Sequence, residues 1–334
     1  MGNEYLQRIG KGDYKALARC ISLIENEVAG YETILEELPT LHTPIIGITG
    51  PPGAGKSTLT DSLIEQIIKE EKKVGILCVD PSSPFNLGAL LGDRVRMSNW
   101  YNNPNVFIRS LATRGSLGGL HPKIIELTEL LKVAQFDYII VETVGVGQSE
   151  IEIAGLADTT VVVVVPEAGD EIQNMKAGLM EIANLFVVNK SDRPGADTFV
   201  KNLRLMLAPA FHKQEIPVPV LKTSAMLKQG IEELFHAIKL NLQQQTVNDK
   251  RFWLLAEKAC YLIQQKKCET SALQCQLEDH PAWRLRQGLQ HQLSAVLTKP
   301  VPRHRSSQLF RRCLQSDKHK GLLGWVGVPA FQCV

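Results

Sequence analysis

The chain has 334 residues, of which 44% are hydrophobic, and its 37 basic and 35 acidic side chains leave a net charge of +2. This is enough apolar material for a buried core, and the near-neutral balance gives no reason to expect nucleic acid or a membrane surface as a general partner. The seven cysteines are scattered without a C-x-x-C pair, no secretory N-terminus is visible, and no apolar run reaches the ~18 residues of a membrane span, so we expect reduced thiols in a cytoplasmic protein.

The first predicted element is helical and lies between residues 4 and 38. Gly12 and Asp13 offer a helix start and Pro39 a stop, and apolar residues recur between them at helical spacing: Leu17, Ile21, Ile24 and Val28. We expect residues 1–42 to form a helical extension that covers one side of the domain that follows.

A phosphate-binding loop comes next. Residues 44–49 read as a short buried strand and residues 56–70 as an amphipathic helix, and between them the chain fits G-x-x-x-x-G-K-[ST] with Gly50-Pro51-Pro52-Gly53-Ala54-Gly55-Lys56-Ser57-Thr58. Glycines let backbone N–H groups curl around phosphates, and the helix N-terminus adds partial positive charge. We expect Lys56 to reach the β- and γ-phosphates and the Ser57 hydroxyl to ligate Mg²⁺.

Strands and helices alternate in the rest of this region. Short apolar segments predict strands at residues 74–79, 106–110, 137–142, 160–165, 185–189 and 218–221, with helices such as 122–134 and 170–183 between them. Such alternation is typical of an α/β domain whose mostly parallel sheet is flanked by helices, with ligands at the carboxyl ends of the strands.

Three carboxylates fall where this arrangement places a ligand. Glu142 closes a predicted strand and Asp80 closes an earlier one, while Asp93 lies in a Gly-containing connection. Hard oxygen ligands are what Mg²⁺ prefers, although Asp80 and Asp93 suit helix or turn caps equally well. Gly145, three residues after Glu142, allows a backbone N–H to approach the γ-phosphate.

Another motif selects the base. Asn189-Lys190-Ser191-Asp192 fits the N-K-x-D pattern of GTP-binding proteins, because guanine presents two adjacent donors that the Asp192 carboxylate accepts together. Adenine would face that carboxylate with an acceptor. After the next predicted strand, Thr223-Ser224-Ala225 offers a backbone N–H to the guanine carbonyl, and we expect Ser224, Ala225 and Met226 to line the base. The sequence therefore predicts GTP rather than ATP.

The composition changes beyond the nucleotide motifs. We expect a P-loop GTPase domain over residues 43–240, a helical region rich in Gln, Leu and Lys over 241–298, and a basic tail over 299–334 that is typical of a flexible, solvated segment. An extended helical region of this kind favours self-association, with core packing as the alternative.

Taken together, these motifs resemble the methylmalonyl-CoA mutase-associated GTPase family, the MeaB/ArgK type that includes the methylmalonic aciduria type A protein, within the SIMIBI class of P-loop GTPases. The resemblance covers about residues 10 to 235. Besides the phosphate loop and Asn189–Asp192, it rests on residues 12–19, 79–83 (V-D-P-S-S), 91–97 (L-G-D-R-V-R-M), 114–119 (R-G-S-L-G-G), 141–150 (V-E-T-V-G-V-G-Q-S-E) and 168–173 (A-G-D-E-I-Q).

This resemblance implies a GTPase that chaperones a cobalamin-dependent acyl-CoA mutase, gates its cofactor loading, and protects or reactivates it. It implies that Mg²⁺ is held by Ser57, Asp80, Asp93 and Glu142, and that the C-terminal helices form a homodimer. It also implies a switch that relays the nucleotide state to the mutase through Ala168, Gly169, Asp170, Glu171 and Lys176. Glu167 stands where the family tends to have glycine.

For the reaction we expect water to attack the γ-phosphate in line, with Lys56, Glu142 and Gly145 in the catalytic set. Val146 stands where Ras-like enzymes carry the water-positioning glutamine, so we expect slow intrinsic hydrolysis that a partner accelerates; Arg94, Arg96 and Arg109 are candidate arginine fingers or simply ion-pairing residues. Three other functions stay open: a nickel-insertion GTPase, which would need paired Cys or His ligands, a kinase of a basic amino-acid transport system, and a switch that binds GTP without useful hydrolysis.

Overall fold

The computed structural model describes residues 2–80, 97–114, 120–145, 151–167, 180, 182–210, 218–244 and 256. Every helix and strand named below lies in the first of the two compact units of the chain, Met1–Leu254. Several predicted features fall outside the described residues: Asp93, Arg94 and Arg96, residues 146–150, the switch residues 168–176 with most of the helix predicted at 170–183, and the region from 257 onward.

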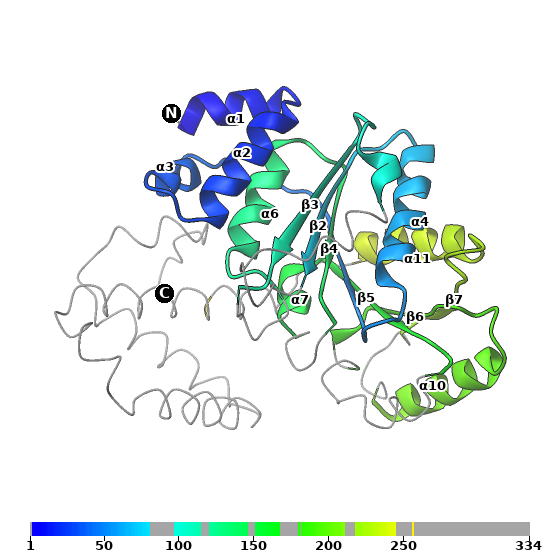
Figure 1. The fold of residues 1–334 in the computed structure, drawn as a ribbon. Coiled ribbons are helices and arrows are strands. Elements are labelled where there is room, and N and C mark those ends of the chain that lie inside the picture. Colours follow the sequence, from blue (N-terminus) through cyan, green and yellow to red (C-terminus); the bar gives the residue numbers. More distant parts are fainter. Residues whose placement is uncertain are drawn as a thin grey trace, which may run out of the picture. The chain divides into compact units, whose positions relative to one another are not determined.

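A seven-stranded sheet forms the centre of the described structure, in the order β3-β2-β4-β1-β5-β6-β7 (Figure 1). All six neighbouring pairs are parallel. The strands are β1 (Ile45–Thr49), β2 (Val74–Asp80), β3 (Val106–Ala112), β4 (Tyr138–Glu142), β5 (Thr159–Val164), β6 (Leu185–Val188) and β7 (Val220–Lys222). The predicted parallel α/β fold is confirmed, and each predicted strand is found within a few residues of its expected bounds.

Helices cover both faces of the sheet because successive residues of a strand point to opposite sides. Ile46 and Val161 pack with α4 (Lys56–Lys69) and α11 (Ile231–Gln244) on one face. Ile45 and Val162 belong to the opposite face, which α6 (Ile124–Val133), α7 (Ile151–Leu156) and α10 (Ala196–Ala210) cover. A single turn of 3₁₀-helix, η1 (Ser98–Trp100), precedes β3.

Three N-terminal helices extend the core beyond the edge of the sheet: α1 (Gly2–Gly10), α2 (Tyr14–Glu25) and α3 (Tyr31–Glu36). The predicted start at Asp13 is an N-cap, since its side chain accepts hydrogen bonds from the backbone N–H groups of Lys15 and Ala16, both at 3.0 Å. Tyr14 packs against the rings of Phe107 and Phe136, both at 5.6 Å between centroids. The N-terminal helices therefore share one apolar core with α6 and β3.

Charged groups also fix α2 to β3. The Glu25 carboxylate at the end of α2 contacts Nη2 of Arg109 at 2.8 Å and Nη2 of Arg114 at 3.4 Å, and Arg114 donates to the Glu25 carbonyl at 2.6 Å. An arginine at the last carbonyls of a helix also complements its dipole. Arg109 is thus an ion-pairing residue here, as one of the two sequence interpretations expected.

Replacing Glu25 with alanine is expected to lower the free energy of unfolding by about 1–3 kcal/mol, because it removes charged hydrogen bonds to two arginines from a partly buried site. Urea unfolding followed by circular dichroism measures this. Glu36→Ala, at an exposed position of α3, is the matched control. Equal midpoints for the two variants would show that the Glu25 ion pairs do not stabilise the fold.

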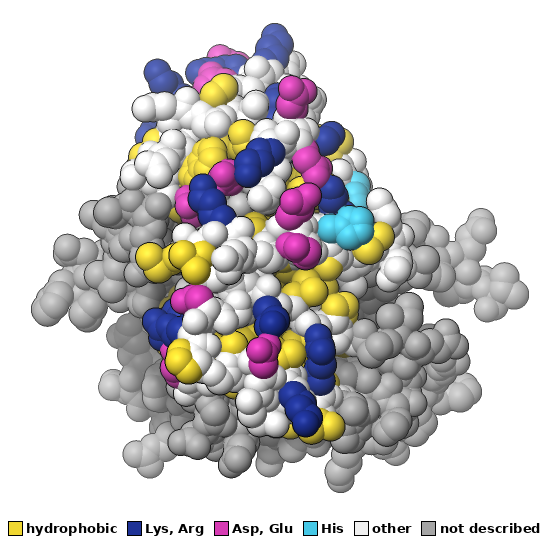
Figure 2. Space-filling model, turned by 90° about the vertical axis from the view of Figure 1, so that its right-hand side faces the viewer, with side chains coloured by type: hydrophobic (Ala, Val, Ile, Leu, Met, Phe, Trp, Pro, Cys, Tyr) yellow, Lys and Arg dark blue, Asp and Glu magenta, His cyan; other side chains and the backbone are white. Residues whose placement is uncertain are grey.

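The face that carries α4 and α11 is highly charged but balanced. Figure 2 shows basic and acidic side chains interleaved over this face. Ion pairs join the two helices and their flanks, with Lys228 and Lys239 at 2.5 Å from Glu65 and Glu70 respectively. Neighbouring charges offset one another, so the described residues of this face produce no broad field of one sign. In the described part of the chain, every helix is too short or too polar to cross a bilayer.

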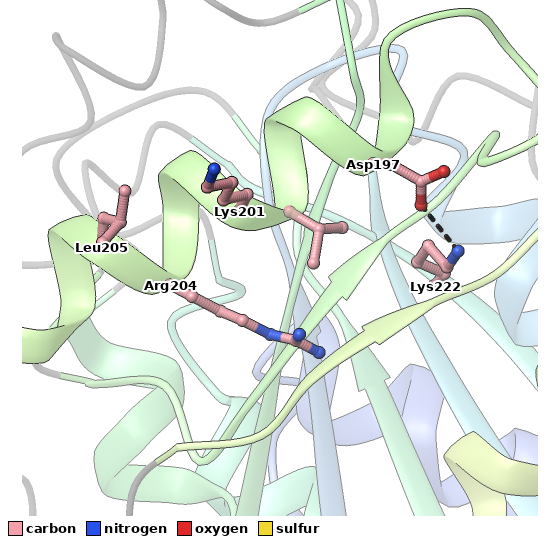
Figure 3. A pocket seen from close by; sticks show the side chains of 6 residues that line it. Asp197, Lys201, Arg204, Leu205 and Lys222 are labelled. Carbon is pink, nitrogen blue, oxygen red and sulfur yellow. Dashed lines mark hydrogen bonds and ion pairs between the residues drawn. The ribbon is translucent and has the colours of Figure 1, made fainter.

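At one edge of the sheet, side chains of α10 protect β7 (Figure 3). Arg204 donates to the Val220 carbonyl at 3.1 Å, and Lys222 pairs with Asp197 at 2.8 Å. Covering an edge strand in this way hinders its pairing with another chain. A cavity of ≈ 370 Å³ lies here, lined by Asp197, Val200, Lys201, Arg204, Leu205 and Lys222. None of the predicted nucleotide-binding residues lines it.

Candidate functional site: a nucleotide cleft at the carboxyl ends of the strands

The predicted site residues meet at one edge of the sheet because parallel strands present their carboxyl ends together. The phosphate loop follows β1, Asp80 and Glu142 end β2 and β4, and Asn189 follows β6. Glu142 lies in register with Ile48 of β1 and Cys78 of β2, so its strand runs between the other two. A cavity of ≈ 490 Å³ opens here, lined by Pro52, Gly53, Gly55, Lys56, Ser57, Thr58, Val79, Asp80, Glu142, Thr143, Val144 and Lys190.

The loop after β1 is closely fitted to its surroundings. Gly50 has φ +138°, and a Cβ there would lie 2.0 Å from the carbonyl oxygen of Val163, so no larger residue fits. Lys56 is 7% exposed and its Nζ donates to the carbonyls of Gly50 at 2.9 Å, Pro51 at 3.2 Å and Val144 at 3.4 Å. The ammonium group is therefore held at the loop, among backbone groups that face the cleft.

Gly145 brings the second motif against the first. A Cβ at this residue, whose φ is +82°, would lie 2.3 Å from the Gly50 carbonyl oxygen and 2.4 Å from Lys56 Nζ. The close approach thus requires glycine for both space and backbone conformation. It places the backbone of Gly145 beside the group predicted to hold the terminal phosphates.

Oxygen-bearing side chains cluster beside the loop. The Ser57 hydroxyl donates to Glu142 Oε1 at 2.7 Å, both residues are buried, and the buried Asp80 lines the same cavity. A hydroxyl and two carboxylates suit Mg²⁺, which prefers hard oxygen ligands and completes its shell with water and phosphate. The described residues contain no group of three or more His, Cys, Asp or Glu side chains arranged for a metal, as a nickel or zinc site would favour.

On the base side, Asn189 ties two loops together. Its Nδ2 donates to the Ala54 carbonyl at 2.9 Å, while its Oδ1 accepts from the Thr223 hydroxyl and the Ala225 N–H, both at 3.2 Å. Lys190 adds a bond from Nζ to the Gly53 carbonyl at 2.8 Å. These two side chains fix the spacing between the phosphate loop and the predicted base-binding loop.

Asp192 is exposed and faces the segment around Ser224, the second one predicted to bind the base. Its Oδ1 accepts the Ser224 hydroxyl at 2.5 Å, and this hydrogen bond lowers the pKa of Asp192 below its usual value. The carboxylate consequently stays charged to lower pH than an ordinary aspartate. The next residue, Arg193, pairs with Glu167 and lowers the pKa of that carboxyl too.

The expected backbone donor for the guanine carbonyl is already engaged. The N–H groups of Thr223, Ser224 and Ala225 donate to Val188 O at 2.9 Å, Gln229 O at 3.0 Å and Asn189 Oδ1 at 3.2 Å. The prediction treated these amides as available, because hydrogen bonds to distant segments cannot be seen in the sequence. The bond from Ala225 is the longest of the three, and a guanine carbonyl at that amide would share it with Asn189. Met226 is 86% exposed beside it.

Several hydroxyls at the site could not be recognised in advance from the sequence. Thr60 donates to Glu142 Oε2 at 2.9 Å, and the Thr49 and Thr143 hydroxyls lie 2.9 Å apart. Ser62 donates to the Ala225 carbonyl at 3.1 Å. Only Thr60 carried a detectable signal: it lies three residues after Ser57 and therefore on the same helix face.

Comparison with known proteins decides the family. The protein-family model described as "Methylmalonyl Co-A mutase-associated GTPase MeaB" matches residues 17–265 of this chain. The chain belongs to the MeaB family. This confirms the family resemblance stated from the sequence, and it identifies the protein as a P-loop GTPase that hydrolyses GTP.

Individual relatives of this MeaB-family chain include a GTPase, a fused mutase and a protein with a solved structure. A protein of Pyrococcus horikoshii named as a GTPase is 48% identical over 242 residues, which are 71% of this chain and 76% of the relative. The "Fused isobutyryl-CoA mutase" of Geobacillus kaustophilus is 40% identical over 204 residues, which are 58% of this chain and 19% of that protein. A solved structure titled "Crystal structure of LAO/AO transport system kinase" superposes with a TM-score of 0.62 at 27% identity, over 94% of this chain and 97% of that one.

Proposed function

We propose that this GTPase works with Mg²⁺ and acts as a chaperone of a cobalamin-dependent acyl-CoA mutase, gating its cofactor loading and protecting or reactivating it. The residues that line the cleft support the Mg²⁺ part of this proposal. Ser57, Asp80 and Glu142, together with Asp93, would hold the ion, which when bound supplies positive charge to the phosphate oxygens.

The chain's own groups have separate tasks in this proposal. Lys56 and the N–H groups of residues 50–58 stabilise the charge that develops as the oxygen of a water bonds to the γ-phosphorus and the bond to the β-phosphate oxygen breaks. The Gly145 N–H approaches the γ-phosphate. Asn189 and Lys190 hold the base-binding loop against the phosphate loop, and Asp192 accepts the guanine donors.

We expect slow hydrolysis by the chain alone, because Val146 stands where Ras-like enzymes carry the water-positioning glutamine. Arg109 is held by Glu25 at 2.8 Å on the α2 side of the sheet, so it is unsuited to serve as an arginine finger. A partner would then supply the missing positive charge, which in other GTPases accelerates hydrolysis by roughly 10³–10⁵-fold.

The observation that carries the mutase proposal is the fused relative, in which a segment similar to this GTPase belongs to the same polypeptide as an acyl-CoA mutase. Proteins joined in one chain act at high effective concentration on each other. A cytoplasmic location and a homodimer built by residues 241–298 complete the proposal and remain predictions from the sequence, as do the switch residues 168–176.

The test is GTP turnover with and without a mutase. Adding a purified cobalamin-dependent acyl-CoA mutase is expected to raise phosphate release by about tenfold or more, since the partner completes the charge stabilisation. Heat-inactivated mutase and a Lys56→Met GTPase are the controls. An unchanged rate with every such mutase of the source organism would remove the chaperone proposal and leave the GTPase activity in place.

The solved kinase structure keeps a second candidate open, in which phosphate passes to a protein of a transport system. The same experiment separates the two functions. With γ-labelled GTP, a chaperone GTPase releases all label as inorganic phosphate, whereas a kinase leaves label on a solute-binding protein added in place of the mutase.

A further inference from the structure

The Glu142 carboxylate accepts hydrogen bonds from two hydroxyls of the same helix. Ser57 donates to its Oε1 at 2.7 Å, and Thr60 donates to its Oε2 at 2.9 Å. Ser57 and Thr60 are three residues apart on α4, so one helix face presents both hydroxyls to the end of β4. Each carboxylate oxygen therefore has its own donor, which fixes the position and the rotation of the carboxylate.

The Thr60 side chain has more than the ordinary role of a helical threonine. A threonine inside a helix commonly bonds the carbonyl four residues earlier, and Thr60 lies 3.0 Å from the Lys56 carbonyl in this way. The hydroxyl carries a single proton, and the charged Glu142 carboxylate, which comes from another element 82 residues further along the chain, is the stronger of the two acceptors. Thr60 is completely buried, so water does not compete with it for Glu142.

We propose that Thr60 is a positioning residue for Mg²⁺: its hydroxyl holds Glu142 Oε2 so that the carboxylate stays aligned with Ser57 at the metal site. The inference rests on the proposed Mg²⁺ function of Glu142. Groups that orient a metal ligand typically change metal affinity by about 10–100-fold when they are removed. Thr60 itself contacts neither nucleotide nor metal in this assignment.

The experiment measures how the rate at which the full chain releases a fluorescent GDP analogue depends on the Mg²⁺ concentration. For Thr60→Val, which keeps the side-chain shape and loses the hydroxyl, the Mg²⁺ concentration that half-maximally slows release is expected to rise about tenfold or more. The release rate in EDTA should stay at the wild-type value. Thr60→Ser restores the hydroxyl and should return the Mg²⁺ dependence to near wild type.

Thr128→Val is the matched control. Thr128 is also a completely buried helical threonine, and its hydroxyl donates to the Ile125 carbonyl on α6, which covers the opposite face of the sheet from α4. If Thr60→Val and Thr128→Val share one Mg²⁺ dependence, or if Thr60→Val speeds release equally with and without Mg²⁺, Thr60 only supports the fold and the proposal is overturned. Should the wild-type protein itself release GDP independently of Mg²⁺, the failure lies in the proposed metal site. Thermal unfolding of each variant confirms that it is folded in the assay.

Discussion

Replacing Asp192 with asparagine is expected to reduce guanine nucleotide binding by roughly 10²–10³-fold and to remove the preference over adenine nucleotides. The carboxylate matches the two adjacent donors of guanine, whereas asparagine turns an N–H₂ donor toward them. Xanthine carries a carbonyl in place of the exocyclic amine, so the same variant should gain affinity for xanthosine nucleotides. Calorimetry with GDP, ADP and xanthosine diphosphate measures all three changes.

Asp197→Asn is the matched control for this substitution. Asp197 is also an exposed aspartate with a lowered pKa, but its partner is Lys222 on β7. It should leave base selection unchanged. If Asp192→Asn behaves like Asp197→Asn, guanine is recognised elsewhere and the assignment of the base site is wrong.

The Ser224 hydrogen bond adds a pH dependence to this prediction. Because Ser224 lowers the pKa of Asp192, the charged form that accepts from guanine persists as the pH falls through the usual aspartate range. Ser224→Ala removes that bond and lets the pKa rise. The variant should then lose its preference for GDP over ADP at a higher pH than the wild type does, while both agree near neutral pH.

Replacing Lys56 with methionine is expected to slow single-turnover GTP hydrolysis by roughly 10²–10³-fold or more, the scale seen when one charge-stabilising donor is removed from an active site. The ammonium of Lys56 is held by three carbonyls of the loop region, and methionine has similar length without the charge. Phosphate release from pre-bound GTP isolates the chemical step from nucleotide binding.

Lys69→Met tests whether the effect is specific. Lys69 lies on the same helix, α4, and forms an exposed pair with Glu65, so its loss should leave hydrolysis unchanged. Comparable rates for Lys56→Met and wild type would mean that Lys56 does not stabilise the transition state. Circular dichroism should show that both variants retain the fold, because Lys56 also binds the loop carbonyls.

Much of the fold could be predicted because it follows from local pattern. Strand and helix periodicities placed all seven strands and the helix after the phosphate loop, and the order of these elements predicted the parallel sheet that the structure has. The nucleotide motifs were predicted for a similar reason: fixed residue types at fixed spacing in the chain do not depend on distant contacts. The family comparison then confirmed the GTPase assignment.

The contacts that could not be predicted from the sequence share one physical cause. The N–H of Ala225, which belongs to the segment predicted to supply a donor to guanine, donates to Asn189, 36 residues away in sequence. The Thr60 contact with Glu142 spans 82 residues, and the Glu25 contact with Arg109 spans 84. Each depends on which strands become neighbours and in what register, and no short segment carries that information.

The sequence by itself thus determined the alternating architecture and the phosphate loop and predicted the choice of guanine, since each of these depends on residues close together along the chain. Only the tertiary structure decided how Asn189 ties the base loop to Ala54, how two hydroxyls of α4 hold Glu142, and how α2 captures Arg109 and Arg114. A direct hydrogen bond requires its donor and acceptor to lie about 3 Å apart. For residues that are distant in the sequence, only the folded arrangement of the helices and strands brings the two groups that close.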